Sequence, residues 1–242
     1  MMNILLKKIV QPCTGLTLAL CLISGFAVAS GNELALPNLP EASKMTAPTQ
    51  AQLGKLEDGY GLNVGDIMPS FVLKTHTGEP AQSSELLARA ETLLVIFYRG
   101  GWCPYCNLQI RQLTESYSQF KQRKVLPVLI SADKIDAAAL AQSRYEIPFP
   151  VLSDPDLVAH KDFRVVMSLT PELYETYKGY GIDVEQWSGR DHHQFAVASA
   201  FLVDAQGKVK WAHASLDYKQ RPSVAQLLDA IDGNIKNSQR KL

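Results

Sequence analysis

Short continuous apolar runs and helically spaced apolar residues alternate along this chain. Two runs stand out, residues 92–98 (TLLVIFY) and residues 125–130 (VLPVLI). Runs of this length, apolar on both faces, are typical of strands buried between two layers of helices. The residues that follow the first run at intervals of three or four, and so share one helical face, are Ile110, Leu113, Tyr117 and Phe120. We therefore expect a buried strand, a turn and an amphipathic helix over residues 92–120.

Weaker patterns predict the remaining elements. Strands are expected at residues 71–74 and 149–152, and a hairpin joins residues 200–203 to 208–212 around Asp204-Ala205-Gln206-Gly207. Helices are expected from a cap at Ser83 or Ser84 to Ala90, from a cap at Asp133 to Tyr145, before Phe163, from Pro171 to Tyr180, and from Ser223 to Ile235. Residues 181–193 look like an irregular insertion. The order β-α-β-α-β-α-β-β-α predicts an α/β fold with a mixed central sheet and helices on both faces.

The first residues carry the pattern of a secretory signal peptide. Lys7 and Lys8 precede an apolar stretch at residues 14–28, and Ala27-Val28-Ala29 matches a small-residue cleavage site before Ser30. A membrane anchor is the alternative, but the stretch is shorter than the roughly 20 residues that span a bilayer. We expect cleavage of residues 1–29, a periplasmic or otherwise exported protein, and no stable membrane association after cleavage.

Composition bears on the domain boundaries, on nucleic-acid binding and on the number of possible disulfides. Residues 30–58 hold scattered prolines and few large apolar residues, so we expect a flexible lead-in with a helix near residues 49–57, followed by one domain over residues 59–242. The net charge of zero offers no electrostatic support for nucleic-acid binding. Of the four cysteines, only Cys103 and Cys106 remain once residues 1–29 are removed. An exported chain with this single pair has no disulfide framework beyond the pair itself.

The two cysteines form a C-x-x-C pair at the predicted start of a helix. Pro104, between them, suits the first helical position. The helix dipole there stabilises a thiolate by about 0.3–1 kcal/mol, which is up to about one pKa unit. Arg99 either turns inward and stabilises the thiolate or is a solvated loop residue. Trp102 either covers the dithiol, binds a partner or packs in the core.

Three kinds of chemistry are open to such a pair. A redox cycle needs one thiolate to attack and the other to resolve the adduct as a disulfide. A zinc site needs two further ligands, and no second cysteine pair exists; His192 and His193 are adjacent rather than spaced. A purely structural disulfide would close too small a loop to stabilise much. His192 and His193 either border the site or form a polar loop. We expect a redox site without metal or cofactor.

The stretch F-Y-R-G-G-W-C-P-Y-C at residues 97–106 resembles the peroxiredoxins, that is, the alkyl hydroperoxide reductase/thiol-specific antioxidant (AhpC/TSA) family of the thioredoxin superfamily. The likeness covers about residues 59–231, with supporting stretches at residues 151–155, 201–207 and 217–221. It implies a thioredoxin-like fold of the peroxiredoxin type and an antioxidant oxidoreductase. It also implies a hydroperoxide or disulfide substrate and an external thioredoxin-like dithiol as reductant.

Carried over residue by residue, the resemblance gives two assignments. In the peroxiredoxin pattern Cys106 is the peroxide-reactive cysteine, Cys103 stands where a threonine or serine is usual, and Arg99 stands where a proline is usual. The remote arginine of that pattern would fall near Ala198. In the thioredoxin pattern Cys103 attacks and Cys106 resolves, and the expected cis-proline would also fall near Ala198. This chain departs from both patterns at that position.

Three functional hypotheses follow. The first is an exported thiol peroxidase in which Cys106 attacks a hydroperoxide and Cys103 closes a Cys103–Cys106 disulfide. The second is a thiol–disulfide oxidoreductase in which Cys103 attacks protein disulfides. The third is a non-enzymatic redox-sensing or partner-binding module that uses Trp102 and residues 181–193.

Overall fold

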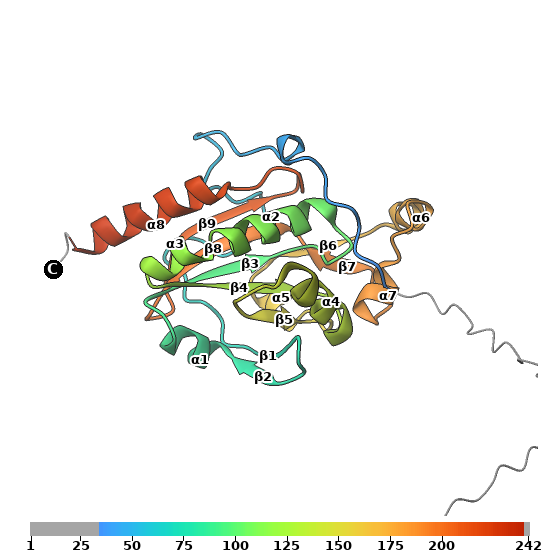
Figure 1. Cartoon of the computed structure of the whole chain (residues 1–242), viewed down its shortest axis with the longest axis horizontal. Helices are drawn as coiled ribbons and strands as arrows, with labels where there is room; N and C mark the ends of the chain where they lie inside the picture. The colour runs from blue at the N-terminus through green and yellow to red at the C-terminus, as the bar shows by residue number, and fades with distance from the viewer. Residues whose placement is uncertain (1–33, 240–242) are drawn as a thin grey trace, which may run out of the picture. The chain divides into compact units, whose positions relative to one another are not determined.

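The computed structural model describes residues 34–239, and the predicted signal peptide lies outside this range. A seven-stranded mixed sheet forms the centre of the described part, in the order β2-β1-β5-β4-β3-β8-β9 (Figure 1). The strands are β1 Val72–Thr75, β2 Pro80–Gln82, β3 Thr92–Phe97, β4 Val125–Ser131, β5 Val151–Ser153, β8 Ala198–Asp204 and β9 Val209–Ser215. The thioredoxin-like α/β fold is thereby confirmed.

Strand β3 lies in the middle of the sheet and leads into the site. It pairs in parallel with β4 and antiparallel with β8. Its residues from Leu93 to Phe97 are all buried, as the continuous apolar run predicts. The predicted hairpin is also confirmed, since β8 and β9 pair antiparallel around the Asp204–Gly207 turn. Strands β8 and β9 thus form an antiparallel edge of a sheet whose central strands β3, β4 and β5 are parallel.

Eight α-helices accompany the strands within residues 34–239. They are α1 Ser83–Ala88, α2 Pro104–Glu115, α3 Tyr117–Gln122, α4 Ile135–Tyr145, α5 Val158–Asp162, α6 Pro171–Gly179, α7 Val184–Ser188 and α8 Val224–Gln239. The apolar face that predicts one helix over residues 104–120 runs on across a break at Ser116 into α3, and Leu113 and Phe120 are both fully buried. Helix α2 runs along the sheet beside α4 (Figure 1).

Two predicted helix caps are wrong. Lys134, not Asp133, is the N-cap of α4, and the Asp133 carboxylate turns instead toward the loop before α2. Ser83 is the first residue of α1, after the N-cap Gln82, and its hydroxyl accepts the backbone N–H of Phe71 at 3.1 Å. In both cases the side-chain oxygen accepts a backbone N–H from a distant segment instead of an N–H at the start of its own helix.

The insertion predicted as irregular, residues 181–193, contains one short helix, α7 (Val184–Ser188). Strand β6 (Val166–Ser168) pairs antiparallel with β7 (Gln194–Ala196), and α6 and α7 lie between them in sequence. The predicted helix from Pro171 to Tyr180 is confirmed as α6. These elements stand at one end of the sheet (Figure 1), so they reach the start of α2 rather than its far end.

The described part of the lead-in, residues 34–58, lies against the domain. It holds one 3-10 turn at Ala42–Lys44, and turns occupy residues 50–54. The helix expected near residues 49–57 is therefore wrong. Thr46 forms an isolated parallel bridge with Gln220, and the backbone carbonyl of Lys55 accepts the N–H of Ala214 at 2.9 Å. In Figure 1 the segment passes the start of α2 and continues above β9.

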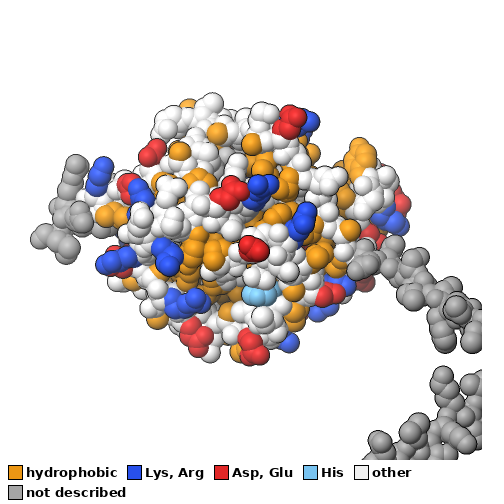
Figure 2. Space-filling model, in the orientation of Figure 1, with side chains coloured by type: hydrophobic (Ala, Val, Ile, Leu, Met, Phe, Trp, Pro, Cys, Tyr) orange, Lys and Arg blue, Asp and Glu red, His pale blue; other side chains and the backbone are white. Residues whose placement is uncertain are grey.

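The surface carries charges of both signs. On the face shown in Figure 2, acidic, basic and apolar side chains are interspersed, and no basic area dominates. Among the helices of residues 34–239, none is long and apolar enough to cross a membrane.

Candidate active site

The two cysteines lie at the start of α2, where the sequence predicts them. Cys103 is the N-cap residue and Pro104 the first helical residue. The Sγ of Cys103 accepts the backbone N–H of Cys106 at 3.3 Å. Both are free thiols, and the exposed fractions are 1% for Cys103 and 0% for Cys106. One free N–H of the first helical turn, that of Cys106, thus donates to a sulfur, an arrangement that favours a thiolate.

Two glycines shape the turn between β3 and the dithiol. Gly100 has φ +145°, and a Cβ there would lie 2.4 Å from Trp102 Nε1 and 2.8 Å from Asp133 Oδ1. A Cβ on Gly101 would lie 2.7 Å from the Trp187 ring. Glycine lets the backbone pass between these groups, where any side chain would displace them.

Arg221 is the closest charged partner of the dithiol. Its Nη2 donates to Cys106 Sγ at 3.0 Å, and its Nη1 donates to Gln109 Oε1 at 2.8 Å. The third bond runs from Nε to the carbonyl of Tyr218 at 2.9 Å. The side chain is 2% exposed. A buried guanidinium fixed by three hydrogen bonds is a preorganised cation for a thiolate and for oxygens that approach it.

Arg99 turns inward, which is one of its two predicted orientations. Its guanidinium lies 4.8 Å from the Trp102 ring and 4.5 Å from the Tyr218 ring, and it donates to the Tyr177 hydroxyl. The ring of Phe195 lies 4.8 Å away on a further side. Cation–π contacts of this kind stabilise a buried cation without neutralising it. Arg99 therefore adds a second positive charge beside the cysteines.

Trp102 packs in the core beside this arginine. Its indole is 5% exposed and stands edge-on to Phe195 at 5.1 Å and to Tyr177 at 5.8 Å. Of its three predicted roles, packing and cover of the dithiol loop agree with this position. Binding of a partner through the indole would require Trp102 to leave the core.

The two sulfurs share their protons. Burial would raise the pKa of Cys103, but the hydrogen bond from the Cys106 thiol and the charges of Arg221 and Arg99 lower it to about 6. Burial and the neighbouring Cys103 sulfur raise the pKa of Cys106, although Arg221 opposes them. In such a coupled pair the first proton belongs to the pair as a whole. The dithiol thus holds one negative charge at neutral pH.

Asp133 is a buried carboxylate that sequence reasoning assigned to a helix cap. Its Oδ2 accepts the N–H of Gly101 at 2.8 Å and the Ser131 hydroxyl at 2.9 Å. Burial raises the pKa of Asp133 to about 7, against the lowering effect of these two bonds. The Cys106 charge raises it further, so the dithiol and this carboxylate influence one another.

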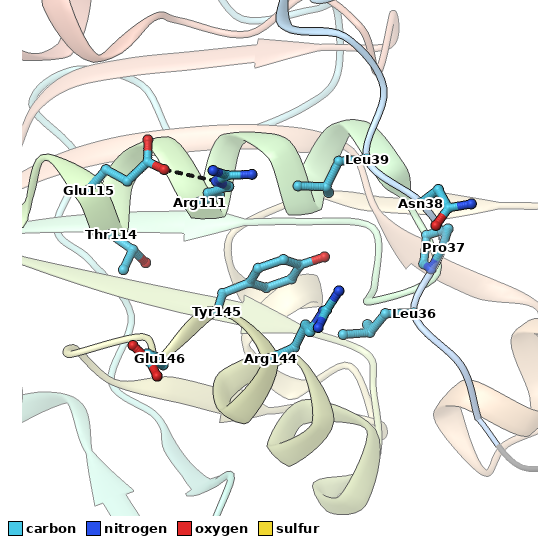
Figure 3. Close-up of a pocket in the computed structure, with 10 residues that line it drawn as sticks. All are labelled: Leu36, Pro37, Asn38, Leu39, Arg111, Thr114, Glu115, Arg144, Tyr145 and Glu146. Carbon is cyan, nitrogen blue, oxygen red and sulfur yellow. Dashed lines mark hydrogen bonds and ion pairs between the residues drawn. The ribbon is translucent and has the colours of Figure 1, made fainter.

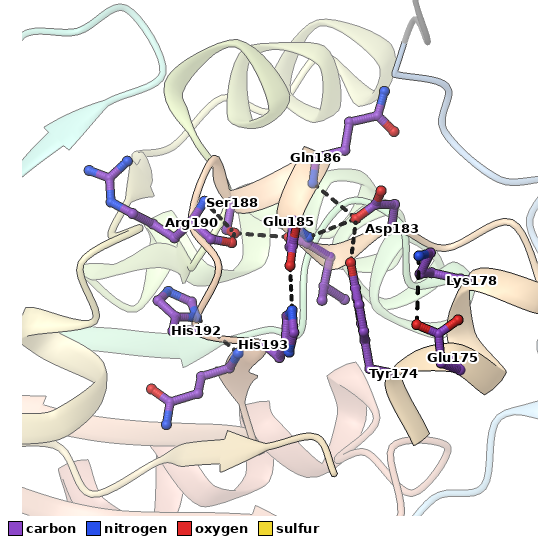
Figure 4. A network of polar contacts seen from close by, with 12 residues as sticks. Tyr174, Glu175, Lys178, Asp183, Glu185, Gln186, Ser188, Arg190, His192 and His193 are labelled. Carbon is purple, nitrogen blue, oxygen red and sulfur yellow. Dashed lines mark hydrogen bonds and ion pairs between the residues drawn. The ribbon is translucent and has the colours of Figure 1, made fainter. Parts of the chain in front are cut away.

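His192 and His193 belong to a polar network of the insertion (Figure 4). His193 stacks on Tyr174 at 3.8 Å between ring centroids, and its Nε2 lies 2.5 Å from Glu185 Oε1. His192 Nε2 lies 2.9 Å from the carbonyl of Pro155. The described hydrogen bonds of both histidines thus run within the insertion and to the loop after β5, and none of them reaches the dithiol. The insertion borders the site through Trp187 instead.

Ala198 opens β8, is 5% exposed and pairs with Ser215. No arginine stands there, and Arg221 approaches the sulfur from the loop after β9. The sequence signal for Arg221 is the stretch 217–221, which supports the family resemblance but does not by itself indicate a site residue. Within the described residues, no group of three His, Cys, Asp or Glu side chains could hold a metal ion.

Comparison with known proteins identifies relatives of this chain. The family model of the AhpC/TSA family matches residues 64–212. Chloroplastic peroxiredoxin Q of Sedum lineare is 30% identical over 138 residues, which cover 56% of this chain and 73% of that protein. Peroxiredoxin Bcp of Escherichia coli K12 is 27% identical over 158 residues, covering 65% and 88% of the two chains.

Solved structures agree in fold. Peroxidoxin BcpB of Mycobacterium tuberculosis superposes with a TM-score of 0.56 at 19% identity, covering 71% of this chain and 97% of that one. AhpC of Enterococcus faecalis gives a TM-score of 0.57 at 14% identity, with coverages of 74% and 96%. At these identities the likeness shows the fold alone. Together with the family match, it shows that this chain belongs to the AhpC/TSA family and is a thiol oxidoreductase with a peroxiredoxin-type thioredoxin-like fold.

Proposed function

We propose that this protein is an exported thiol peroxidase that reduces hydroperoxides through a Cys103/Cys106 dithiol–disulfide cycle. The observation that carries the proposal is the 3.0 Å hydrogen bond from Arg221 to Cys106 Sγ in a dithiol that shares one negative charge. Family membership supports peroxide as the oxidant and argues against a purely non-enzymatic module.

In the first step the proton that the two sulfurs share lies on Cys103, and the Cys106 thiolate attacks the terminal oxygen of the hydroperoxide. A sulfur–oxygen bond forms, the oxygen–oxygen bond breaks, and the departing alkoxide takes the Cys103 proton to leave as an alcohol, or as water from hydrogen peroxide, so that Cys103 becomes the thiolate. Positive charge from Arg221 stabilises the oxygen on which negative charge develops. Cys106 is thereby oxidised to a sulfenic acid.

In the second step the Cys103 thiolate attacks the sulfenic sulfur. A disulfide forms and hydroxide departs, taking up a proton to leave as water. Because the Cys103 sulfur lies one helical turn from Cys106 and accepts its backbone N–H at 3.3 Å, we expect this step to proceed without unwinding α2. Two electrons from an external thioredoxin-like dithiol then restore the pair.

Export rests on the signal-peptide pattern of residues 1–29. Edman sequencing of the protein recovered from the periplasm should begin at Ser30. Recovery of a chain that still carries residues 1–29 would contradict export with cleavage.

Single cysteine variants test the order of attack. Cys103→Ser exposed to hydrogen peroxide should form a sulfenic acid on Cys106, detected with a dimedone probe and mass spectrometry. Cys106→Ser should react no faster than an ordinary thiol. The reverse pattern would contradict the peroxidase order.

The lowered pKa of Cys103 favours one alternative, a thiol–disulfide oxidoreductase in which Cys103 attacks protein disulfides. The same variants distinguish it. If Cys106→Ser traps a mixed disulfide with a disulfide-containing protein substrate, and Cys103→Ser does not react with peroxide, the alternative replaces the peroxidase.

A further inference from the structure

The arginine that contacts Cys106 lies on a loop without regular structure. Residues 216–223 connect β9 to α8, and the loop contains a turn in which Asp217 accepts the N–H groups of Lys219 and Gln220. Side chains connect this turn to α2, where the Tyr218 ring lies 5.5 Å from the Tyr105 ring, but among the described residues no backbone hydrogen bond joins the two. A buried arginine with several rotatable bonds needs its backbone fixed if its guanidinium is to stay within 3.0 Å of a sulfur.

The fixing contacts come from the N-terminal segment. The N–H of Thr46 donates to the carbonyl of Lys219 at 3.0 Å, and the N–H of Arg221 donates to the carbonyl of Thr46 at 2.9 Å. These two bonds bracket Gln220 and form the parallel bridge between Thr46 and Gln220. Among the residues that the structure describes, they are the backbone hydrogen bonds that tie residues 217–221 to another segment.

The same segment is anchored on both sides of the loop. Before it, the N–H of Ala214 in β9 donates to the carbonyl of Lys55 at 2.9 Å. After it, Gln226 Nε2 donates to the carbonyl of Pro48 at 2.7 Å, while Gln226 Oε1 accepts the N–H of Ser223 at the start of α8. The loop that carries Arg221 is therefore enclosed by contacts to one strap, residues 34–58.

The beginning of this strap also reaches the cysteine turn. A Cβ on Gly101 would lie 3.3 Å from Leu36 Cδ2. Figure 3 shows residues 36–39 beside α2 and the end of α4, where Leu36 and Leu39 line a hollow of about 430 Å³ with Arg111 and Tyr145. One segment thus contacts both the turn that carries Cys103 and the loop that carries Arg221.

We propose that the backbone of Thr46, in the N-terminal strap (residues 34–58), positions Arg221 on the Cys106 sulfur. The family match ends at residue 212 and begins at residue 64, so the strap and Arg221 both lie outside the matched residues. In this chain the two flanking segments together supply the cation that the family pattern would place near Ala198.

Proline at position 46 tests this role, because it removes the N–H that donates to Lys219. The matched control is Ala47→Pro, one residue along the strap. Among the described hydrogen bonds, none is donated by the backbone N–H of Ala47. The first readout is the pH midpoint of iodoacetamide alkylation, which reports the pKa of the dithiol without any need for peroxidase activity. A merely structural role would change stability but not this midpoint.

We expect Thr46→Pro to raise the midpoint by about one pH unit, because Arg221 lowers the pKa of both cysteines. At pH 7 the thiolate fraction should then fall from about nine tenths to about one half, so the reaction with hydrogen peroxide should slow about twofold if the proposed function holds. Ala47→Pro should keep the wild-type midpoint and the wild-type rate. A folded Thr46→Pro protein with the wild-type midpoint would overturn the proposal.

Hydrogen exchange on the wild-type protein provides a test without any variant. The amide hydrogens of Thr46 and Arg221 should exchange far more slowly than those of exposed loop residues, because both are bonded across the bridge. Fast exchange at both positions would contradict the proposal even if Thr46→Pro failed to fold. Absence of peroxide reactivity in the wild type would count against the proposed function and leave both strap tests unaffected.

Discussion

Replacing Arg221 with methionine removes the charge beside Cys106 while keeping an unbranched side chain of similar reach. The lost contact is a charge-assisted hydrogen bond of 3.0 Å to a fully buried sulfur. Such bonds contribute about 1.5–3 kcal/mol, which corresponds to about one to two pKa units at about 1.4 kcal/mol per unit. The first pKa of the dithiol, about 6 in the wild type, should therefore rise into the range of about 7–8.

The assay is the rate of iodoacetamide alkylation as a function of pH under pseudo-first-order conditions. At pH 7 the thiolate fraction should fall from about nine tenths to between about one half and one tenth, so alkylation should slow about two- to tenfold. Arg111→Met is the control, because Arg111 lies on α2, the helix that carries Cys106, but is exposed and paired with Glu115. A midpoint that stays within about 0.3 units of wild type in Arg221→Met would refute the electrostatic reasoning.

Two further predictions concern the turn before the dithiol. The folded-state pKa of Asp133, about 7, lies above its ordinary value of 3.8; its stabilising contribution is therefore complete below pH 3.8 and is lost as pH rises through 7. Asp133→Asn should accordingly flatten the decline of the urea-unfolding free energy between pH 4 and 8, and an unchanged decline would contradict this. Gly101→Ala should destabilise the fold by about 1–3 kcal/mol through contact with Trp187 and Leu36, as measured by urea unfolding. Gly233→Ala in α8, where a Cβ meets nothing within 4 Å, should instead stabilise by up to about 1 kcal/mol, and equal effects at both positions would argue against the close packing.

Local sequence patterns were sufficient to predict the strand, the turn and the helix start that carry the dithiol. The apolar run before Arg99, the glycine turn and Pro104 are short-range signals, and each predicted its element and the position of the dithiol. Such signals work because burial on both faces and the first-turn preference of proline depend on neighbouring residues alone.

The partners of the dithiol could not be predicted in this way. Arg221 is 115 residues away from Cys106, and only the return of the chain past β9 brings them together. Asp133 precedes a helix and is predicted as its cap, but its carboxylate accepts the N–H of Gly101, which lies 32 residues earlier. The strap mixes prolines, polar residues and scattered leucines without a regular spacing. Its two bonds to the Arg221 loop are made by backbone atoms, which side-chain patterns do not reveal.

The most direct test of the account is the reaction of the fully reduced protein with hydrogen peroxide, followed by stopped flow and by thiol counting. The account predicts a second-order rate constant far above that of an ordinary exposed thiol, with two thiols lost per peroxide and a Cys103–Cys106 disulfide as the product. A rate no faster than that of free cysteine, or loss of thiols without that disulfide, would contradict it.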